Sequence, residues 1–442
     1  MAEENQSTEK LLTDFGDAVM DMYRKRNSFF QRNPGADQAE LDKMLDTESK
    51  RILDQYEPIL PTLKGTDKSV ALMLIGRVHN ARSTYSKSAE EFLYKAVKMN
   101  PRLSDAWNEL GECYYKGGQA DKALNCFQCV LKHVQDKKAL RNLSIILRSQ
   151  DRLTATNLRD SVQRSREALQ LDFNDGASWY NLGNAYLTTF FYRGQSEKEL
   201  LQALSCYRKA LSDEDQKSNP DLHYSLAEAS RYTEDFQTAL DSYVASHRFN
   251  PSWTTPLEKA DNLEMYLKEL DEAVHSKGKM RPRKLEQLVK SIKPHHDKAF
   301  PGSTKKYLAD LSPDSSHAEP ATSAAGSAQP NCHVLLKVVA TLSSRALAFT
   351  CCAVDEHLDC VAVSVFNVDE GRAMAVGDTL TIWQPRLRKH SVTLRGGDAA
   401  ARSSVAFRQL RVTDPRTLAV NGRLIPTEWL APVMLKSELY NS

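Results

Sequence analysis

The chain has 442 residues, of which 41% are hydrophobic and 26% are charged, and this balance excludes both a membrane protein and a wholly disordered one. Lysine and arginine number 59 against 57 acidic residues, so the net charge of +2 gives no overall attraction to nucleic acid or to an anionic membrane. No stretch approaches the roughly 18 uninterrupted apolar residues of a transmembrane helix. The opening segment MAEENQSTEKLL lacks the pattern of a signal peptide, so we expect a soluble intracellular protein without a membrane partner.

Two amphipathic segments come first and occupy residues 1–60. In both LLTDFGDAVMDMYRKRNSFF and AELDKMLDTESKRILDQYEPIL the apolar residues recur at steps of three and four, as on one face of a helix. We expect helices that cap the N-terminal end of the repeats that follow.

The next part of the chain contains internal repeats. A W-x2-L-G-x2-Y signature occurs twice, each time followed by small and aromatic residues at the spacing of a second helix, which is the tetratricopeptide pattern. The first copy consists of Trp107, Leu110, Gly111, Tyr114, Ala123 and Phe127, and the second of Trp179, Leu182, Gly183, Tyr186, Ala203, Tyr207 and Ala210, with an insertion after Tyr186. The large residues fill the space between two antiparallel helices, and glycine and alanine let the helices approach closely.

Three weaker units complete a predicted array over residues 61–292. One precedes the first signature, a degenerate one occupies residues 137–172, and one follows the second signature. They are marked by Ile75, Gly76, Ala89, Leu93 and Ala96, by Leu140, Leu143, Ser144, Leu147 and Ala168, and by Leu226, Ala239 and Tyr243. An apolar stripe over about 254–292 then predicts a helix that caps the C-terminal end of the array.

The composition changes after the array. Residues 293–330 are rich in proline, serine, alanine and glycine, which predicts a flexible linker. Residues 331–442 consist of short β-branched runs between turn residues, which indicates an all-β domain of about five strands. Gly377-Asp378 before one run favours an OB-like barrel, and Asn421-Gly422 suits a tight hairpin. The predicted fold is therefore mainly α, a tetratricopeptide-repeat solenoid followed by a C-terminal all-β OB-like barrel.

Catalytic and metal-binding patterns are missing from the sequence. There is no nucleotide-binding, α/β-hydrolase or zinc-protease motif, and Arg395-Gly396-Gly397-Asp398 lacks the helix of a phosphate loop and is predicted to be a hairpin. The eight cysteines are too few for a disulfide scaffold, and the C-x-x-C pair of Cys126 and Cys129 has no second pair, so core packing is favoured over zinc or redox chemistry. We expect neither an enzyme nor a metal or cofactor.

The first helix of each repeat lines the concave wall of a solenoid, a surface suited to an extended peptide. Positions one, five and eight residues after the tryptophan equivalent turn toward that wall. They are Asn108, Glu112, Tyr115, Arg141, Ile145, Arg148, Tyr180, Asn184, Leu187, Tyr224, Glu228 and Arg231, with Asp221 just before the last set. We assign peptide binding to Asn108, Glu112, Arg141, Arg148, Asn184, Asp221 and Glu228. Their mixture of amides and charges of both signs predicts a short peptide that carries both signs, and the alternative for each charge is a solvated helix face.

One basic segment lies beyond the repeats. It contains Lys277, Lys279, Arg281, Arg283, Lys284, Lys290 and Lys293, opposed only by Glu286. Such a run binds phosphates of nucleic acid, ribosomal RNA included, through counterion release, whereas a solvated cap or a nuclear-import signal is the alternative. In the β domain, the few side chains that could stack on single-stranded nucleic acid are Phe366, Trp383 and Phe407, for which core packing is favoured.

These features resemble the tetratricopeptide repeat protein 5 (Strap) family over nearly the whole chain. The resemblance is carried by DAWNELGECYYKGG and SWYNLGNAYL, by NLSIILR, by SNPDLHYSLAEA and by the SKGK of the basic segment. NLSIILR, SNPDL and SKGK lie outside the general repeat consensus and make the resemblance specific.

The resemblance implies a role in tubulin autoregulation. Members of the family meet ribosomes that synthesise tubulin and hold the nascent N-terminal sequence Met-Arg-Glu followed by Cys or Ile. Decay of the tubulin mRNA follows through adaptor and deadenylase factors. Carried onto this chain, Arg148 is implied to pair with the peptide glutamate, Asp221 or Glu228 with the peptide arginine, and residues 277–284 with the ribosome, meaning its RNA and the proteins at the exit site.

A second role is implied by the same resemblance. The family is also described as a stress-responsive nuclear co-activator that scaffolds a histone acetyltransferase and an actin-nucleating cofactor. Both the cytoplasm and the nucleus are therefore expected locations.

Overall fold

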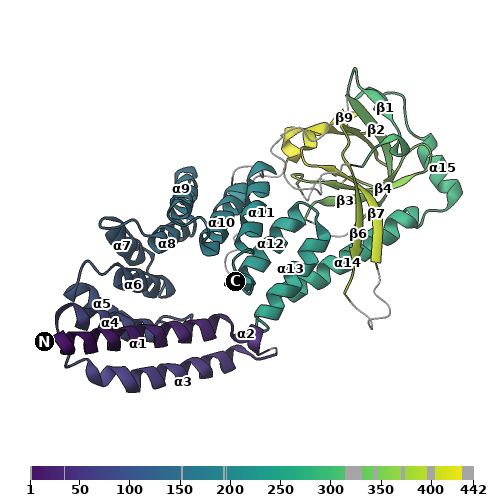
Figure 1. Ribbon diagram of the computed structural model, residues 1–442. Coiled ribbons are helices and arrows are strands. Elements are labelled where there is room, and N and C mark those ends of the chain that lie inside the picture. Colours follow the sequence, from purple (N-terminus) through teal and green to yellow (C-terminus); the bar gives the residue numbers. More distant parts are fainter. Residues whose placement is uncertain are drawn as a thin grey trace. The chain divides into compact units, whose positions relative to one another are not determined.

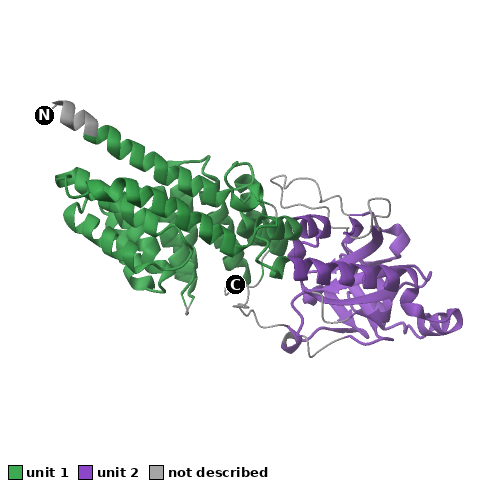
Figure 2. Cartoon of the chain, turned by 90° about the horizontal axis from the view of Figure 1, so that it is seen from below, with its two compact units in different colours: residues 1–229, 242–256, 435–442 green, residues 230–241, 257–434 purple. Residues whose placement is uncertain are grey.

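The chain folds into helices over its first part and strands over its last part, as the computed structural model in Figure 1 shows. The structure describes residues 2–33, 35–150, 153–192, 195, 197–313, 331–342, 347–369, 374–395 and 404–430. These residues form two compact units (Figure 2). Unit 1 contains the described residues up to 229 together with residues 242–256, and unit 2 contains residues 230–241 and the described residues from 257 onward.

Two long N-terminal helices precede the repeats, as predicted. They are α1 (Ala2–Asn27) and α3 (Gln38–Tyr56), with the short α2 (Phe29–Arg32) between them. Asp37 begins α3 with a capping box, because its Oδ1 accepts a hydrogen bond from the Glu40 backbone N–H at 2.9 Å while Glu40 Oε2 accepts one from the Asp37 backbone N–H at 3.1 Å. The rings of Phe15 and Tyr56 stack with centroids 4.4 Å apart, which packs the two helices together.

Five helix pairs follow and confirm the predicted repeat array. They are α4 (Gly65–His79) with α5 (Lys87–Met99), α6 (Ser104–Lys116) with α7 (Ala120–Leu131), α8 (Lys137–Arg148) with α9 (Ala155–Leu171), α10 (Gly176–Tyr192) with α11 (Glu197–Ala210), and α12 (Pro220–Tyr232) with α13 (Phe236–Phe249). A Cβ atom on Gly111 would lie 2.6 Å from the ring of Phe127, and one on Gly183 would lie 2.5 Å from the ring of Tyr207. The aromatic ring of the second helix thus fills the space that glycine leaves on the first.

The insertion after Tyr186 lengthens a helix. α10 has 17 residues where α6 has 13, and its C-terminal part buries Leu187, Phe190 and Phe191 at 3 to 4% exposure. The sequence predicts that Leu187 faces the peptide groove. Leu187 is 4% exposed, so its side chain belongs to the core and the prediction is corrected.

The helices after the repeats group with the β domain. They are α14 (Thr255–His275), the one-turn η2 (Lys277–Lys279) and α15 (Pro282–Lys290). The sequence predicts them as the end of the array, but from residue 257 they belong to unit 2, and so does the turn between α12 and α13. The reason is packing within unit 2: the hydroxyls of Tyr266 and Thr350 lie 3.2 Å apart, and buried Glu234 of the turn accepts a hydrogen bond from Gln409 Nε2 at 2.9 Å.

The β domain forms one sheet with nine strands in its described part, more than the five or so that the sequence predicts. The strands are β1 (Thr304–Lys306), β2 (Cys332–Thr341), β3 (Phe349–Val354), β4 (Cys360–Val365), β5 (Thr379–Trp383), β6 (Leu387–Thr393), β7 (Ser404–Val412), β8 (Leu418–Val420) and β9 (Arg423–Leu424). Their order is β6-β7-β4-β3-β2-β5-β8-β9, with β1 paired to β2. The pairs β1–β2 and β4–β7 are parallel and the others are antiparallel. β8 and β9 flank the predicted Asn421-Gly422 hairpin, whereas β1 was not predicted, because a strand of three residues is too short to show an alternating pattern.

Part of the predicted linker belongs to this sheet. β1 lies within it, and Leu308 and Leu311 after β1 are buried in the core of the β domain. Residues 314–330 of the predicted linker and 396–398 of the predicted Arg-Gly-Gly-Asp hairpin lie outside the described residues. The linker prediction overlooked these two leucines because the surrounding composition is polar and rich in proline.

The predicted tight turn between the last two strands is present. Asn421 and Gly422 have φ angles of 51° and 80°, and the flanking residues Val420 and Arg423 pair across β8 and β9. Two consecutive positive φ angles are what a two-residue hairpin turn of type I′ requires.

The cysteines pack as expected for reduced thiols. Each of the eight described cysteines is free, and burial raises the pKa of Cys126 on α7 to about 12. Within the described residues no group of three or more His, Cys, Asp or Glu side chains is arranged to hold a metal ion. A search of the same residues finds no helix with the length and apolar character needed to cross a membrane.

Candidate peptide-binding site

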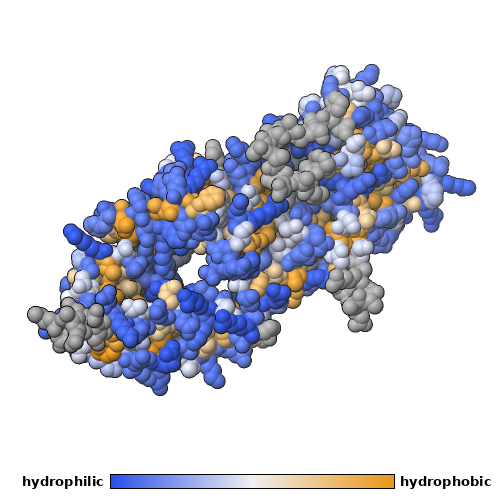
Figure 3. Space-filling model, in the orientation of Figure 1, coloured by the Kyte–Doolittle hydropathy of each residue, from blue (hydrophilic) through white to orange (hydrophobic). Residues whose placement is uncertain are grey.

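The first helices of successive repeats stand side by side and form one wall of unit 1. α4, α6, α8 and α10 contact one another in that order, and Tyr180 of α10 contacts Ser225 of α12. The face of unit 1 that Figure 3 shows is largely hydrophilic, with hydrophobic residues dispersed over it.

The first half of the wall is held together by a buried carboxylate. Glu109 on α6 lies 2.9 Å from Lys138 Nζ of α8 and 3.3 Å from Arg77 Nε of α4, and it accepts a hydrogen bond from Asn80 Nδ2 at 3.2 Å. Burial acts to raise the pKa of Glu109, but the charges of Lys138 and Arg77 outweigh it and hold the pKa below its ordinary value. This carboxylate links three neighbouring repeats.

Two of the predicted peptide-binding residues in the same part of the wall bond to other side chains of the protein. Asn108 is 1% exposed, and its Nδ2 donates to Asp136 Oδ1 at 2.9 Å. Half-buried Glu112 lies 3.1 Å from Lys138 Nζ and accepts a hydrogen bond from Asn142 Nδ2 at 3.2 Å. The prediction that Asn108 faces a ligand is corrected here, because its side chain is buried against the next repeat. For Glu112, whose side chain is 32% exposed, peptide binding stays a prediction.

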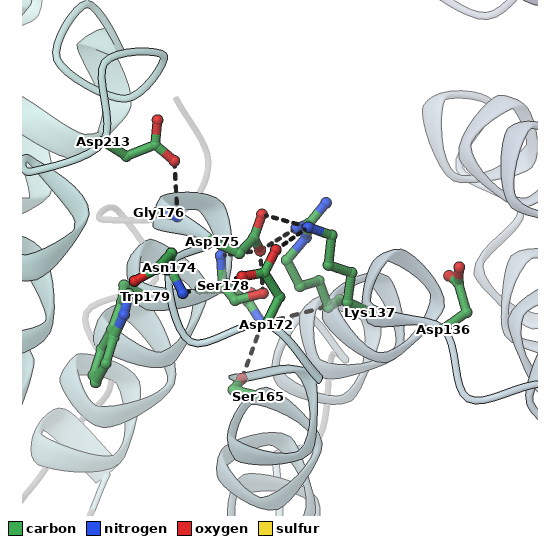
Figure 4. A network of polar contacts seen from close by, with 12 residues as sticks. Asp136, Lys137, Ser165, Asp172, Asn174, Asp175, Gly176, Ser178, Trp179 and Asp213 are labelled. Carbon is green, nitrogen blue, oxygen red and sulfur yellow. Dashed lines mark hydrogen bonds and ion pairs between the residues drawn. The ribbon is translucent and has the colours of Figure 1, made fainter. Parts of the chain in front are cut away.

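Arg141 has a comparable internal role at the joint between α8 and α10. It forms an ion pair with Asp175, which also accepts a hydrogen bond from the backbone N–H of Ser178 at 2.9 Å and so caps α10. Lys137 Nζ lies 2.6 Å from Asp172 Oδ2 and 3.4 Å from Asp175 Oδ1 (Figure 4). The assignment of Arg141 to peptide binding is corrected, since the carboxylate of Asp175 already pairs with its guanidinium.

Arg148 lies further along the wall, in the last turn of α8. Its side chain is half-buried, and its Nη2 donates to Asn181 Oδ1 at 2.7 Å while its Nη1 donates to Ser144 Oγ at 3.1 Å. Asn181 and Ser144 are uncharged side chains, so these two hydrogen bonds bring no negative charge to the guanidinium.

Tyr180, Asn184 and Asp221 complete this part of the wall. Burial raises the pKa of Tyr180 to about 12; the charge of Asp221 adds to the shift, and contacts with Asn184 and Ser225 and the charge of Arg148 oppose it. One hydroxyl therefore lies within electrostatic range of both Asp221 and Arg148. Half-buried Asn184 accepts a hydrogen bond from the Tyr207 hydroxyl at 2.8 Å.

Asp221 is the acidic group that this region offers. Its side chain reaches solvent, yet the protein around it removes enough water to raise the pKa of its carboxyl. Asp221 forms no ion pair with another residue in the described part of the chain.

Glu228 does not share this position. It is 3% exposed and accepts a hydrogen bond from the hydroxyl of Tyr243, which comes from the second helix of the same repeat. The predicted peptide-binding role of Glu228 is therefore corrected: the carboxylate is enclosed between helices. Of the remaining candidates, Tyr224 is buried, Ile145 is half-buried, and Tyr115 is exposed at 41%.

The structure reveals a repeat position that the prediction overlooked. Glu109 and Asn181 each lie two residues after a signature tryptophan, and both are buried and bond back to the preceding first helix. Asn142, at the equivalent place in the degenerate repeat, also reaches back, to Glu112. A polar residue two positions after the tryptophan was the signal available in the sequence.

The predicted basic surface lies in unit 2. Lys277, Gly278 and Lys279 all have positive φ angles, of 50°, 68° and 56°, and a Cβ atom on Gly278 would lie 2.7 Å from the carbonyl oxygen of Val339 on β2. The backbone of this turn therefore rests against the sheet. Among the five predicted contact residues Lys277 is half-buried, and the exposed ones are Lys279, Arg281, Arg283 and Lys284.

Comparisons with known proteins match both units. A family model described as the tetratricopeptide repeat protein 5 OB fold domain matches residues 325–434, and a tetratricopeptide repeat model matches residues 92–125. The human protein named tetratricopeptide repeat protein 5 is 33% identical over 435 residues, and its mouse counterpart is 34% identical over 439 residues, with 96% of both chains covered in each case. The chain belongs to the tetratricopeptide repeat protein 5 family. A solved structure titled "Functional Characterization of Pseudomonas Aeruginosa pilF" has a TM-score of 0.37 and 19% identity and covers 52% of this chain and 96% of that one.

As a member of the tetratricopeptide repeat protein 5 family, the chain is a repeat-based adaptor or scaffold. One arrangement in unit 2 looks catalytic at first: His333, which is 2% exposed, has Nδ1 2.7 Å from Ser303 Oγ and Nε2 2.7 Å from Asp297 Oδ1. The Ser303 hydroxyl, however, also lies 2.6 Å from the Phe300 carbonyl oxygen, which competes with the histidine for its proton. The three side chains fasten the segment before β1 onto β2.

Proposed function

We propose that this protein is a ribosome-associated adaptor that reads the N-terminus of nascent tubulin, Met-Arg-Glu followed by Cys or Ile, and triggers co-translational decay of tubulin mRNA. The observation that supports this is that the hydroxyl of Tyr180 on α10 experiences the opposite charges of Arg148 on α8 and Asp221 on α12. A peptide with adjacent arginine and glutamate is complementary to this pair, which offers one acidic and one basic side chain. Arg148 pairs with the glutamate and Asp221 with the arginine, each charged hydrogen bond contributing about 1.5 to 3 kcal/mol.

A second surface is proposed to hold the ribosome. The cations of the basic segment, Lys277, Lys279, Arg281, Arg283 and Lys284, are the contacts proposed for ribosomal RNA and for proteins at the exit site, with affinity that falls as salt rises. The mRNA-decay adaptor and deadenylase factors are the proposed downstream partners. Both cytoplasm and nucleus are proposed locations, since the alternative role is that of a stress-responsive nuclear scaffold for an acetyltransferase and an actin-nucleating cofactor.

Ribosomes stalled on tubulin or on a control nascent chain, with a photocrosslinker in the chain, test this proposal. Arg148→Ala should lose the crosslink to the tubulin chain, whereas Arg164→Ala, at an exposed arginine paired with Glu167 on α9, should keep it. Reversing the charges of Lys279 and Arg281 should release the protein from ribosomes and leave its binding to the isolated peptide intact. Equal crosslinking of wild type and Arg148→Ala contradicts the peptide site, and recovery of the wild type only with nuclear acetyltransferase complexes favours the scaffold role.

A further inference from the structure

Asn181 bonds in two directions from a buried position on α10. It is 3% exposed; its Oδ1 accepts the hydrogen bond from Arg148 Nη2 at 2.7 Å, and its Nδ2 donates to Ser165 Oγ at 2.9 Å. Because a guanidinium has only donors, the amide oxygen must face Arg148 and the amide nitrogen must face Ser165. The orientation of this side chain is thereby fixed.

A cluster of buried hydroxyls supports that orientation. Ser144, Ser161 and Ser165 are fully buried, and Ser144 Oγ lies 2.8 Å from the hydroxyl oxygens of both other serines. Ser165 Oγ donates to the Ser161 carbonyl at 3.0 Å, which leaves its oxygen to accept from Asn181. Ser144 in turn accepts from Arg148 Nη1 at 3.1 Å. Asn181 and Ser144 therefore both accept hydrogen bonds from the guanidinium of Arg148. The buried serines hold both of these side chains in place.

The chemistry of the amide distinguishes this position from its equivalent in an earlier repeat. Glu109 also lies two residues after a tryptophan and also bonds back to an arginine, Arg77, but it brings a full negative charge to that contact. Asn181 makes the same kind of link without adding a negative charge. We propose that Asn181 is the positioning residue of the peptide site: it aims Arg148 toward a peptide carboxylate, and its neutrality makes the site selective for an acidic side chain at that place.

This inference rests on the proposed function, and one substitution tests it. Asn181→Asp is nearly isosteric and places a carboxylate where the amide oxygen meets Arg148. The full chain should then bind the peptide Met-Arg-Glu-Ile about 10- to 100-fold more weakly, whereas its affinity for Met-Arg-Gln-Ile should change little. The ratio of the two affinities should fall close to one. Asn157→Asp, at a half-buried asparagine near the start of α9, is the matched control and should keep the wild-type ratio.

The outcomes separate the two proposals. If the wild type binds the glutamate and glutamine peptides equally, the protein does not recognise the peptide glutamate and the proposed function is contradicted. If the wild type discriminates and Asn181→Asp discriminates just as well, the positioning role is overturned while the peptide site stands. Asn181→Ser, a smaller neutral residue, supplies a second measurement should Asn181→Asp not fold: it should weaken binding of the glutamate peptide and retain part of the discrimination, and complete retention of wild-type affinity contradicts the role.

Discussion

Lys138 Nζ lies 2.9 Å from Oε1 of Glu109, whose side chain is only 4% exposed, so two first helices of the array are joined by a largely buried ion pair. The carboxylate lies at the centre of the first half of the wall, with Arg77 on its other side. Its contribution to stability should be measurable separately from any binding function.

We predict that Glu109→Ala destabilises unit 1 by about 3 kcal/mol, because it leaves Arg77 and Lys138 without their shared acid. Since the folded pKa of Glu109 lies below its ordinary value of 4.5, the stabilisation is complete above about pH 4.5 and is lost as the pH falls through the folded pKa. Denaturant unfolding between pH 3 and pH 7 checks both statements. Glu214→Ala, at a glutamate 84% exposed, is the control and should change stability by less than about 0.5 kcal/mol; equal stability of the two variants contradicts the prediction.

We predict different effects for the two acids of the last repeat. Asp221→Asn should weaken binding of a peptide with arginine at its second position by about 10-fold and leave the fold intact, because the carboxylate is accessible. Glu228→Gln should change peptide affinity little, since that side chain bonds to Tyr243 between helices. Titration of both variants with arginine and with glutamine peptides checks this, and the reverse ranking would show that Glu228 reads the peptide.

Gly278 is predicted to set the position of the basic turn. Gly278→Ala adds a Cβ atom 2.7 Å from the Val339 carbonyl oxygen at a φ of 68°, so the turn must shift and should cost about 1 to 3 kcal/mol. Ribosome binding at moderate salt should fall, and peptide binding should not. Gly302→Ala is the control, because Gly302 also has a positive φ of 80° but open space around it. Identical ribosome binding by both variants argues against a positioning role for Gly278.

Close approach of paired helices gives a further test. Gly111→Ala would set a Cβ atom 2.6 Å from the Phe127 ring and should destabilise the array by about 1 to 3 kcal/mol. Gly16→Ala on α1, which meets nothing within 4 Å, should instead stabilise by about 0.5 to 1 kcal/mol through helix propensity. Thermal unfolding of the two variants should therefore shift in opposite directions, and shifts of the same sign contradict the packing argument.

The repeat fold was predictable because its signature is local. Gly111 and Phe127 belong to one helical hairpin, so their spacing in the sequence predicts that they are in contact. The burial of Asn108 and Glu228 was not predictable in the same way, since each meets a polar partner outside its own helix at a position that helical angles alone do not specify. The grouping of α14 with the sheet depends on contacts between residues far apart in sequence, such as Tyr266 and Thr350, and no periodicity encodes these.

The central claim is that Arg148 reads a glutamate in a short peptide that also carries an arginine. A double-mutant cycle tests it most directly, with binding of Met-Arg-Glu-Ile and Met-Arg-Gln-Ile measured by calorimetry for the wild type and for Arg148→Ala. We predict a coupling energy of about 1.5 to 3 kcal/mol between Arg148 and the peptide glutamate. A coupling energy near zero, with Arg148→Ala binding both peptides as the wild type does, would contradict the account.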